Sequence, residues 1–216
     1  MIAADKFWDK VAAKYAKTPI KDEDAYEQTL TRVRAHLNPS DRVLELGCGT
    51  GTTALKLAGD AKEIVASDIS PAMIDLGRAK AVDADIRNVT FHTTTFNAKS
   101  LRNDGPYDVV TAFNLLHLIE DLPGAMGQIF DLVRPGGLFI SKTFCRPGPG
   151  EGNLEYHVTR VVLPLMQAFR KAPFVAFMTI DDLEGAVRAA GFEIIETGNY
   201  PDRPPRRFIV ARKPEA

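Results

Sequence analysis

The stretch from Val43 to Gly51 limits the possible folds more than any other part of the chain. It reads Val-Leu-Glu-Leu-Gly-Cys-Gly-Thr-Gly, an apolar run that leads directly into a turn with glycine at every second position. Leu44 and Leu46 suit a strand covered on both faces of a parallel sheet. The glycines allow a sharp turn and leave no side chain in the way of a ligand. Because a helix is expected to begin at Thr52, the turn would lie at the carboxyl end of a strand, where open α/β sheets bind ligands.

Further strands and helices alternate after this stretch. Strands are predicted at residues 63–67, 89–94, 107–112, 138–143, 192–197 and 207–211. Helices are expected between them, one of them opened by Ser70 as N-cap and Pro71 at the first helical position. This order predicts a single α/β domain, Rossmann-like, with a mostly parallel sheet covered by helices on both faces. The last two strands, joined by a short proline-rich link, should pair antiparallel.

Two segments flank this core. Residues 1–38 form a helical arm in which Phe7, Val11 and Tyr15 make one apolar stripe; it could cover the sheet, form a lid over the glycine turn, or do both. Residues 39–145 are the expected cofactor-binding core, residues 146–178 an apolar insert, and residues 179–216 the last helix and closing hairpin. Pro164 and Pro173 are expected to break the insert into short helices.

The composition excludes several classes of protein. A formal net charge of −1 gives no general attraction to nucleic acid or to an anionic membrane. No run approaches the roughly 18 apolar residues of a membrane span, and the N-terminus lacks the apolar core of a signal peptide. Cys48 and Cys145 have no metal-ligand spacing and cannot make a disulfide framework. A cytoplasmic protein with reduced thiols is the simplest interpretation.

The spacing of the glycines distinguishes between nucleoside ligands. The dinucleotide fingerprint is G-x-G-x-x-G/A, but its third position falls here on Thr52, and the extra glycine stands one residue earlier at Gly51. With Glu45 as its acid, the loop E-x-G-x-G-x-G resembles the first motif of class I S-adenosylmethionine-dependent methyltransferases. Asp68, which ends the second strand, can accept hydrogen bonds from ribose hydroxyls in either nucleoside family.

Later segments extend the resemblance over roughly residues 40–145. Residues 96–101 are similar to the family's third motif, with Asn97 in place of the usual Asp that accepts from the adenine amino group; an amide carbonyl can also accept this bond, and Thr95 could compete for it. Residues 107–117 resemble the fourth strand and the loop after it. Residues 134–139, Arg-Pro-Gly-Gly-Leu-Phe, resemble the turn into the fifth strand.

This resemblance implies a seven-stranded sheet whose last strand is antiparallel and inserted beside the fifth. It also implies S-adenosyl-L-methionine as donor and S-adenosyl-L-homocysteine as product, with transfer by in-line displacement. By this resemblance, Gly47, Cys48 and Gly49 line the donor, and Glu45 holds the loop and the donor's ammonium region. Asp68 accepts hydrogen bonds from the ribose, Ile69 and Met73 flank the adenine, and Asn97 and Ala98 bind the edge of the adenine. Phe113 or Asn114 lies beneath the reacting end, and Tyr15 lies near the donor's carboxylate. No metal site is implied.

The acceptor is harder to predict. His117, after the fourth strand, is the best-placed candidate for a general base, although a histidine in Leu-Leu-His-Leu can equally be a packed residue. The residues after the fourth strand lack the Pro-Pro-aromatic motif of base-modifying enzymes, and the arginines near the hairpin make no nucleic-acid footprint. A small, largely apolar acceptor enclosed by the arm and the insert is therefore expected. The alternatives are a non-catalytic donor-binding module, a nicotinamide-dependent oxidoreductase or an aminopropyl transferase; the oligomeric state stays open.

Overall fold

The computed structural model describes residues 2–95, 99–148, 152, 154–169 and 171–215. Its elements, in chain order, are α1 (Ala4–Lys17), α2 (Glu23–Arg34), β1 (Arg42–Leu46), α3 (Thr52–Leu57), η1 (Ala58–Asp60), β2 (Glu63–Asp68), α4 (Pro71–Asp83), β3 (Val89–Thr93), α5 (Lys99–Asp104), β4 (Tyr107–Phe113), η2 (Leu116–Leu118), α6 (Leu122–Leu132), β5 (Val133–Phe144), α7 (Leu154–Ala168), α8 (Ile180–Ala189), β6 (Glu193–Asn199) and β7 (Arg206–Arg212). The order of strands and helices agrees with the alternation predicted from the sequence.

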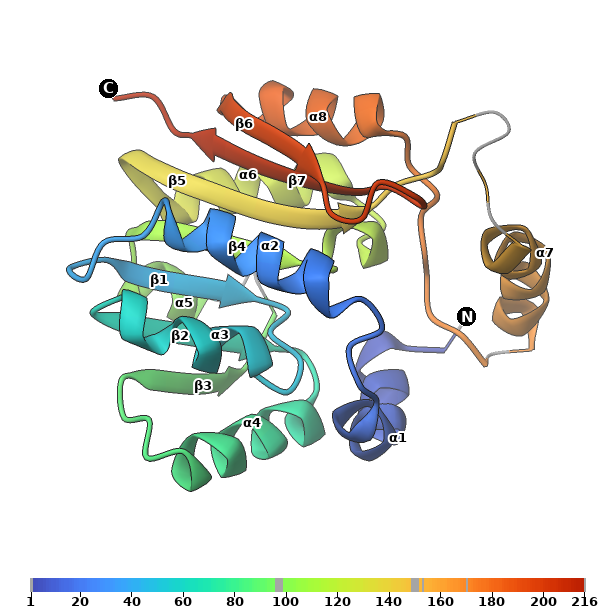
Figure 1. The fold of residues 1–216 in the computed structure, drawn as a ribbon, viewed down its shortest axis with the longest axis horizontal. Helices are drawn as coiled ribbons and strands as arrows, with labels where there is room; N and C mark the ends of the chain where they lie inside the picture. The colour runs from blue at the N-terminus through green and yellow to red at the C-terminus, as the bar shows by residue number, and fades with distance from the viewer. Residues whose placement is uncertain (1, 96–98, 149–151, 153, 170, 216) are drawn as a thin grey trace.

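The strands form one seven-stranded sheet in the order β3-β2-β1-β4-β5-β7-β6 (Figure 1). The first five strands pair in parallel, whereas β7 pairs antiparallel with both β5 and β6. The predicted insertion of an antiparallel last strand beside the fifth strand is confirmed. Because the strand order reverses at β1 and β4, the loops after these two strands border a switch point, where such sheets bind ligands.

Two apolar layers hold the helices on the two faces of the sheet. On one face, Leu30 of α2, Leu57 of α3 and Ile74 of α4 pack on strand residues such as Ile140. On the other face, α6 and α8 pack on Leu44 and Phe139. Residues 140 and 142 lie on the same side of β5 because side chains alternate along a strand. Lys142 therefore points into the layer that α2 covers.

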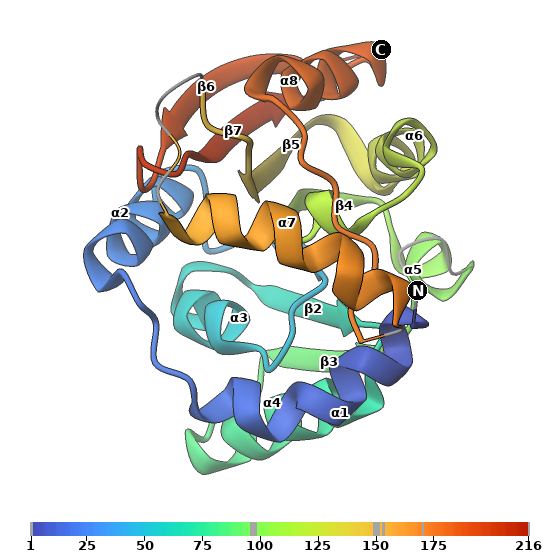
Figure 2. The same cartoon turned by 90° about the vertical axis from the view of Figure 1, so that its right-hand side faces the viewer.

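The arm and the insert both lie at the carboxyl edge of the parallel strands. Figure 1 shows α1 and α7 beyond the arrowheads of β1 and β5, and Figure 2, seen from that edge, shows α7 crossing in front of the sheet while α1 runs along α4. The arm thus both covers an element of the fold, through α1 on α4, and borders the glycine turn.

The expected break of the insert at Pro164 is wrong. Helix α7 runs through Pro164 as one element of 15 residues, and no helix or strand is assigned to residues 171–179. A proline at this position removes the bond to the carbonyl of Arg160. Arg160 is exposed, so water can satisfy that carbonyl and the helix can continue. None of the helices in the described part of the chain is long and apolar enough to span a bilayer.

Candidate active site

The glycine turn between β1 and α3 is built from left-handed backbone. Gly47, Gly49 and Gly51 have φ angles of +64°, +54° and +70°, which strongly favour glycine. A Cβ on Gly47 would lie 2.7 Å from a methyl group of Leu115, and a Cβ on Gly51 would run into Phe91. The nearest atom to a Cβ on Gly49 would instead be in the ring of Tyr15, 3.8 Å away. The turn is therefore packed from below at its ends and open at Gly49.

Asp68, at the end of β2, is bonded to this turn. Its carboxylate accepts a hydrogen bond from the backbone N–H of Gly49 and another from that of Ser70, each 2.9 Å long. Burial raises the pKa of Asp68, while these backbone bonds act in the opposite direction. Because a carboxylate has about four acceptor positions, Asp68 can keep both bonds and still accept from a ligand hydroxyl.

Glu45 and Cys48 are the two ionisable groups buried beside the turn. Glu45 is 3% exposed, and desolvation raises its pKa to about 8, with the charge of Asp68 adding to the effect. Cys48 is also buried, and desolvation raises the pKa of its thiol well above the usual value. A thiol of this kind is unreactive at neutral pH. Glu45, in contrast, is a buried acid that a cationic ligand group would ionise.

A cavity of about 640 Å³ opens beside the turn, between the arm, the carboxyl ends of β4 and β5, and the insert. The arm contributes Tyr15 and Tyr26, whose hydroxyl group lies 3.2 Å from that of Thr53. Partial burial and the charge of Asp68 raise the pKa of Tyr15. Apolar residues form much of the remaining wall: Ile20, Phe144, Leu163, Val175 and Phe177.

The far end of this cavity carries polar groups from three strands and a short helix. Asn114 follows β4 with a φ of +53° and accepts a hydrogen bond of 2.9 Å from Arg206. His117 lies on η2; burial and Arg206 lower its pKa to about 4, and its Nδ1 has no hydrogen-bond partner among the described residues. Lys142, on β5, is 6% exposed. These four groups can together bind and orient the polar end of a ligand.

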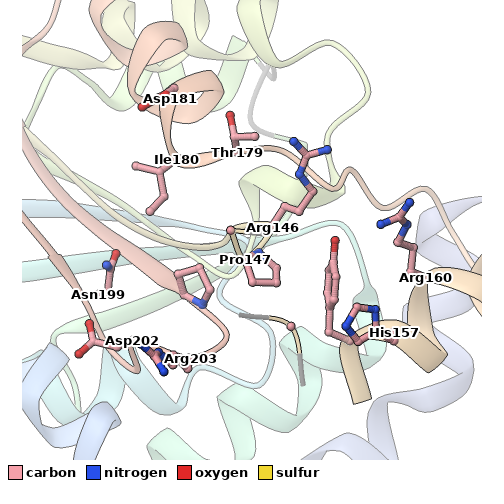
Figure 3. Close-up of a pocket in the computed structure, with 14 residues that line it drawn as sticks. Arg146, Pro147, His157, Arg160, Thr179, Ile180, Asp181, Asn199, Asp202 and Arg203 are labelled. Carbon is pink, nitrogen blue, oxygen red and sulfur yellow. The ribbon is translucent and has the colours of Figure 1, made fainter. Parts of the chain in front are cut away.

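A second cavity, of about 810 Å³, lies next to the first, and Tyr156 lines both. Figure 3 shows its walls, which include Arg146 after β5, Arg160 on α7 and Arg203 before β7. It is the larger of the two, yet it contains none of the residues predicted from the sequence. It also lies away from the glycine turn. The smaller cavity is therefore the candidate active site.

The predicted site residues fall into three groups. Tyr15, Asn114 and His117 line the cavity, while Gly47, Cys48, Gly49, Glu45 and Asp68 make the turn and its support. In the third group, Ile69, Met73 and Phe113 do not line the cavity. Ile69 is 38% exposed, Met73 is 2% exposed, and Phe113 packs into the layer under α2. Asn97 and Ala98 lie outside the described residues.

Three cavity residues, Tyr26, Lys142 and Arg206, were missed by sequence reasoning. The signal for Lys142 was present, since it is the one charged residue in the predicted strand at 138–143. A lysine is unusual in a strand that is expected to be buried on both faces, so its presence there indicates a specific role. Tyr26 and Arg206 carry no such local signal, because only the folded chain brings α2 and β7 to this edge.

Comparison with known proteins identifies the family. The family model described as a methyltransferase domain matches residues 20–197. The chain belongs to this family. A ubiquinone biosynthesis O-methyltransferase of Burkholderia thailandensis is 24% identical over 213 residues, which cover 96% of this chain and 87% of the relative.

Solved structures agree with this fold. The YcgJ protein of Bacillus subtilis superposes with a TM-score of 0.66 at 16% identity, covering 88% of this chain and 100% of the other. The geranyl diphosphate C-methyltransferase of Streptomyces coelicolor, solved with S-adenosyl-L-homocysteine, gives a TM-score of 0.66 at 15% identity and covers 88% and 79% of the two chains. The chain is a class I methyltransferase whose methyl donor is S-adenosyl-L-methionine.

The residues at the turn of this methyltransferase fit that donor. The open side of Gly49 lets a ligand approach the backbone, and the Asp68 carboxylate keeps free acceptor positions for hydroxyl groups. Glu45 offers a buried acid to an ammonium group. The cavity extends from Thr50 of this turn to Asn114, after β4, and Lys142 of β5.

Proposed function

We propose that this methyltransferase transfers a methyl group to the oxygen of a small, largely apolar acceptor bound in the 640 Å³ cavity. The observation that carries the proposal is the wall of this cavity, where side chains of the arm, of β5 and of the insert present apolar surface opposite the glycine turn. The name of the Burkholderia relative, a ubiquinone biosynthesis O-methyltransferase, supports an oxygen acceptor on an apolar molecule.

We assign the donor to the residues around the turn. Gly47, Cys48 and Gly49 contribute backbone to its binding, and Glu45 faces its ammonium group. Asp68 accepts from the ribose. The adenine lies between Ile69 and Met73, with Asn97 and Ala98 at its edge, and Tyr15 closes the site over the amino-acid end. Of the two candidates for the place beneath the reacting end of the donor, Phe113 and Asn114, we assign Asn114, because it lines the cavity.

The main contribution of the protein to the reaction is the alignment of the acceptor with the donor's methyl group. The donor supplies an activated methyl group, so the enzyme gains rate by holding the acceptor oxygen in line with it and by excluding water. The arm and α7 are the elements placed to do this, because both stand at the carboxyl edge of the sheet (Figure 2). A catalytic role for His117 remains a hypothesis.

Methyl transfer can be tested with isotopically labelled donor and two catechols that differ in an apolar tail, catechol and 4-hexylcatechol. We expect single-turnover labelling of both, with a lower KM for the hexyl compound because its tail removes apolar surface from water. A non-catalytic donor-binding module would bind S-adenosyl-L-homocysteine and label neither compound nor any component of a metabolite extract. An oxidoreductase would bind NADH in a calorimetric titration and would label neither catechol.

The place of the acceptor can be tested on α7. Leu163 lines the cavity, whereas Val161, two residues earlier on the same helix, is 68% exposed. We expect Leu163→Arg to raise KM for 4-hexylcatechol at least 10-fold, because it puts a charge into the apolar wall. The matched control Val161→Arg should change KM less than 2-fold. Equal KM values for the two variants would contradict an acceptor bound against the insert.

A further inference from the structure

Lys142 is a buried lysine that the donor-binding residues leave without a role. It lies on strand β5, where it pairs with Phe208 of β7 on one side and with Phe113 of β4 on the other. Its side chain lines the candidate active site together with Asn114 and His117. A lysine is rarely buried to this degree without an acidic partner, yet Lys142 makes no ion pair in the part of the chain that the structure describes.

The hydrogen bonds of Lys142 match a neutral amine. Its Nζ donates to the hydroxyl group of Thr29 at 2.8 Å and to the backbone carbonyl of Ala25 at 3.4 Å, both on α2. A neutral amine has two hydrogens and one lone pair, so these two acceptors use both hydrogens. An ammonium group has three donors and would lack an acceptor for the third among the described residues. The third position on Nζ, a hydrogen in the ammonium form and a lone pair in the neutral form, has no partner among the described residues, and Lys142 lines the cavity.

The charges around Lys142 favour the same state. Its pKa is lowered to about 8, mainly by desolvation and then by the charge of Arg206, while Asp22 acts in the opposite direction. The other titratable groups that line the cavity with it are Tyr15, Lys21, Tyr26, His117 and Tyr156. A general base works best when its pKa lies near the working pH. His117, whose pKa is held at about 4, is a much weaker base at the same end of the cavity.

We propose that Lys142 is the general base for a hydroxyl acceptor, an inference that rests on the proposed oxygen methylation. The neutral amine takes the hydroxyl proton and becomes an ammonium group as the oxygen attacks the methyl carbon. The O–H bond and the sulfur–methyl bond break, the O–CH₃ bond forms, and the sulfur keeps the electron pair of its broken bond. Lys142 then returns the proton to solvent through the cavity. Arg206, held on Asn114, disfavours the ammonium form and so helps this release.

A purely structural role predicts a different outcome. In that case Lys142 only ties β5 to α2, and the loss of either hydrogen-bond partner would have the same effect. Thr29→Val removes the hydroxyl partner and keeps the amine, so its effect measures the tie alone. Lys142→Met removes the amine at similar volume, and Lys142→Arg keeps a cation and hydrogen-bond donors but cannot become neutral.

The first test needs no acceptor. NMR titration of protein labelled with ¹³C at the lysine ε carbon, saturated with S-adenosyl-L-homocysteine, should show one lysine that titrates at least one pH unit below the others. This resonance should be absent from Lys142→Met. A spectrum in which every lysine titrates near the ordinary value would overturn the proposal.

The second test uses catechol and 4-nitrocatechol. The nitro group acidifies the phenol, so 4-nitrocatechol is already ionised at pH 8 and needs no general base. With catechol we expect Lys142→Met and Lys142→Arg to lose at least 100-fold in kcat, and Thr29→Val less than 10-fold. With 4-nitrocatechol the loss in both Lys142 variants should shrink below 10-fold. Affinity for S-adenosyl-L-homocysteine, measured by calorimetry, should stay within 3-fold of the wild type in all variants.

Three results would overturn the assignment. They are equal losses with the two catechols, near wild-type activity in Lys142→Arg, or a loss in Thr29→Val as large as that in Lys142→Met. A wild-type protein that binds S-adenosyl-L-homocysteine and methylates neither catechol would contradict the hydroxyl acceptor and, with it, this base. Failure of methyl transfer altogether would show instead as the absence of labelled product with every acceptor, including the components of a metabolite extract.

Discussion

At the scale of single residues, Glu45 links stability to function. Its pKa is raised from 4.5 to about 8 by burial. As the pH rises through 4.5, the unfolded chain loses this proton while the folded chain keeps it until about pH 8. Stability therefore falls across that window, by about 1.4 kcal/mol per pH unit at most, and levels off above it. The fold holds an acid in a place that disfavours its charge.

We expect Glu45→Gln to remove this penalty. The amide can still accept the bond from the backbone of Ala54, so the variant should be more stable than the wild type by roughly 2–4 kcal/mol at pH 8 and nearly equal to it at pH 4.5. If Glu45 faces the donor's ammonium group, the same variant should bind S-adenosyl-L-homocysteine at least 10-fold more weakly. Urea unfolding at the two pH values and calorimetry provide the measurements. A stability difference independent of pH would contradict the raised pKa.

How far single residues can be predicted depends on the distance of their partners along the chain. The glycines at 47, 49 and 51 were predictable because the demand for positive φ is local. Asp68 was predictable as the acid at the end of the second strand, but its bond to Gly49 was not. The bond from Lys142 to Thr29 spans 113 residues, and no local spacing encodes it. The acceptor end of the site was therefore the part that sequence reasoning described least.

At the scale of elements, Asp9 of α1 bonds the arm to the first turn of α4. Asp9 accepts a hydrogen bond of 2.5 Å from the hydroxyl of Ser70 and one of 3.1 Å from the backbone N–H of Ala72. It thus adds a second cap to α4, whose own N-cap, Ser70, already accepts from Met73. An anion at this end also interacts favourably with the helix dipole. Tyr15, whose ring lies near Gly49, is on the same helix as Asp9.

Removal of the contact should loosen the arm. We expect Asp9→Ala to lower the free energy of unfolding by about 1 kcal/mol and to raise hydrogen exchange in α1 relative to the sheet. Affinity for S-adenosyl-L-homocysteine should fall several-fold because Tyr15 is no longer held at the turn. Asp5→Ala is the matched control, since Asp5 lies one turn earlier and has no side-chain partner among the described residues. Equal exchange in the two variants would mean that Asp9 does not hold the arm.

Helices and strands were predicted well where the local sequence pattern was strong. Their ends were predicted less well where tertiary contacts determine how far an element extends. The capping box of Thr179 and Asp182 was expected and is present. Strand β5 begins at Val133 rather than at residue 138, because Val133 pairs with Tyr107 before the glycines of the turn. Helix α7 continues through Pro164 because its far side is exposed to water. Neither extension can be deduced without knowing what lies beside the segment.

At the scale of the whole molecule, an ion pair joins α2, early in the chain, to β6, near its end. Arg32 of α2 donates two hydrogen bonds to Glu196 of β6, at 2.7 and 2.6 Å, and His36 lies 2.7 Å from the same carboxylate. The contact joins the helix that carries Tyr26 and the partners of Lys142 to the hairpin that carries Arg206. A clamp between these elements holds the walls of the cavity in place.

The clamp gives stability a second dependence on pH, opposite in sign to that of Glu45. The Arg32 hydrogen bonds, followed by His36, hold the pKa of Glu196 at about 2, so its contribution is complete above pH 4.5 and is lost as the pH falls towards 2. We expect Glu196→Gln to unfold with a free energy about 1 kcal/mol lower at pH 7, a figure kept small because Arg32 is 41% exposed. Urea unfolding at pH 7, 4 and 3 should show this gap closing as the pH falls. The control Glu193→Gln, on the exposed end of β6, should show no gap at any pH; a gap in Glu196→Gln that persists unchanged at pH 3 would mean that the ion pair is not its source.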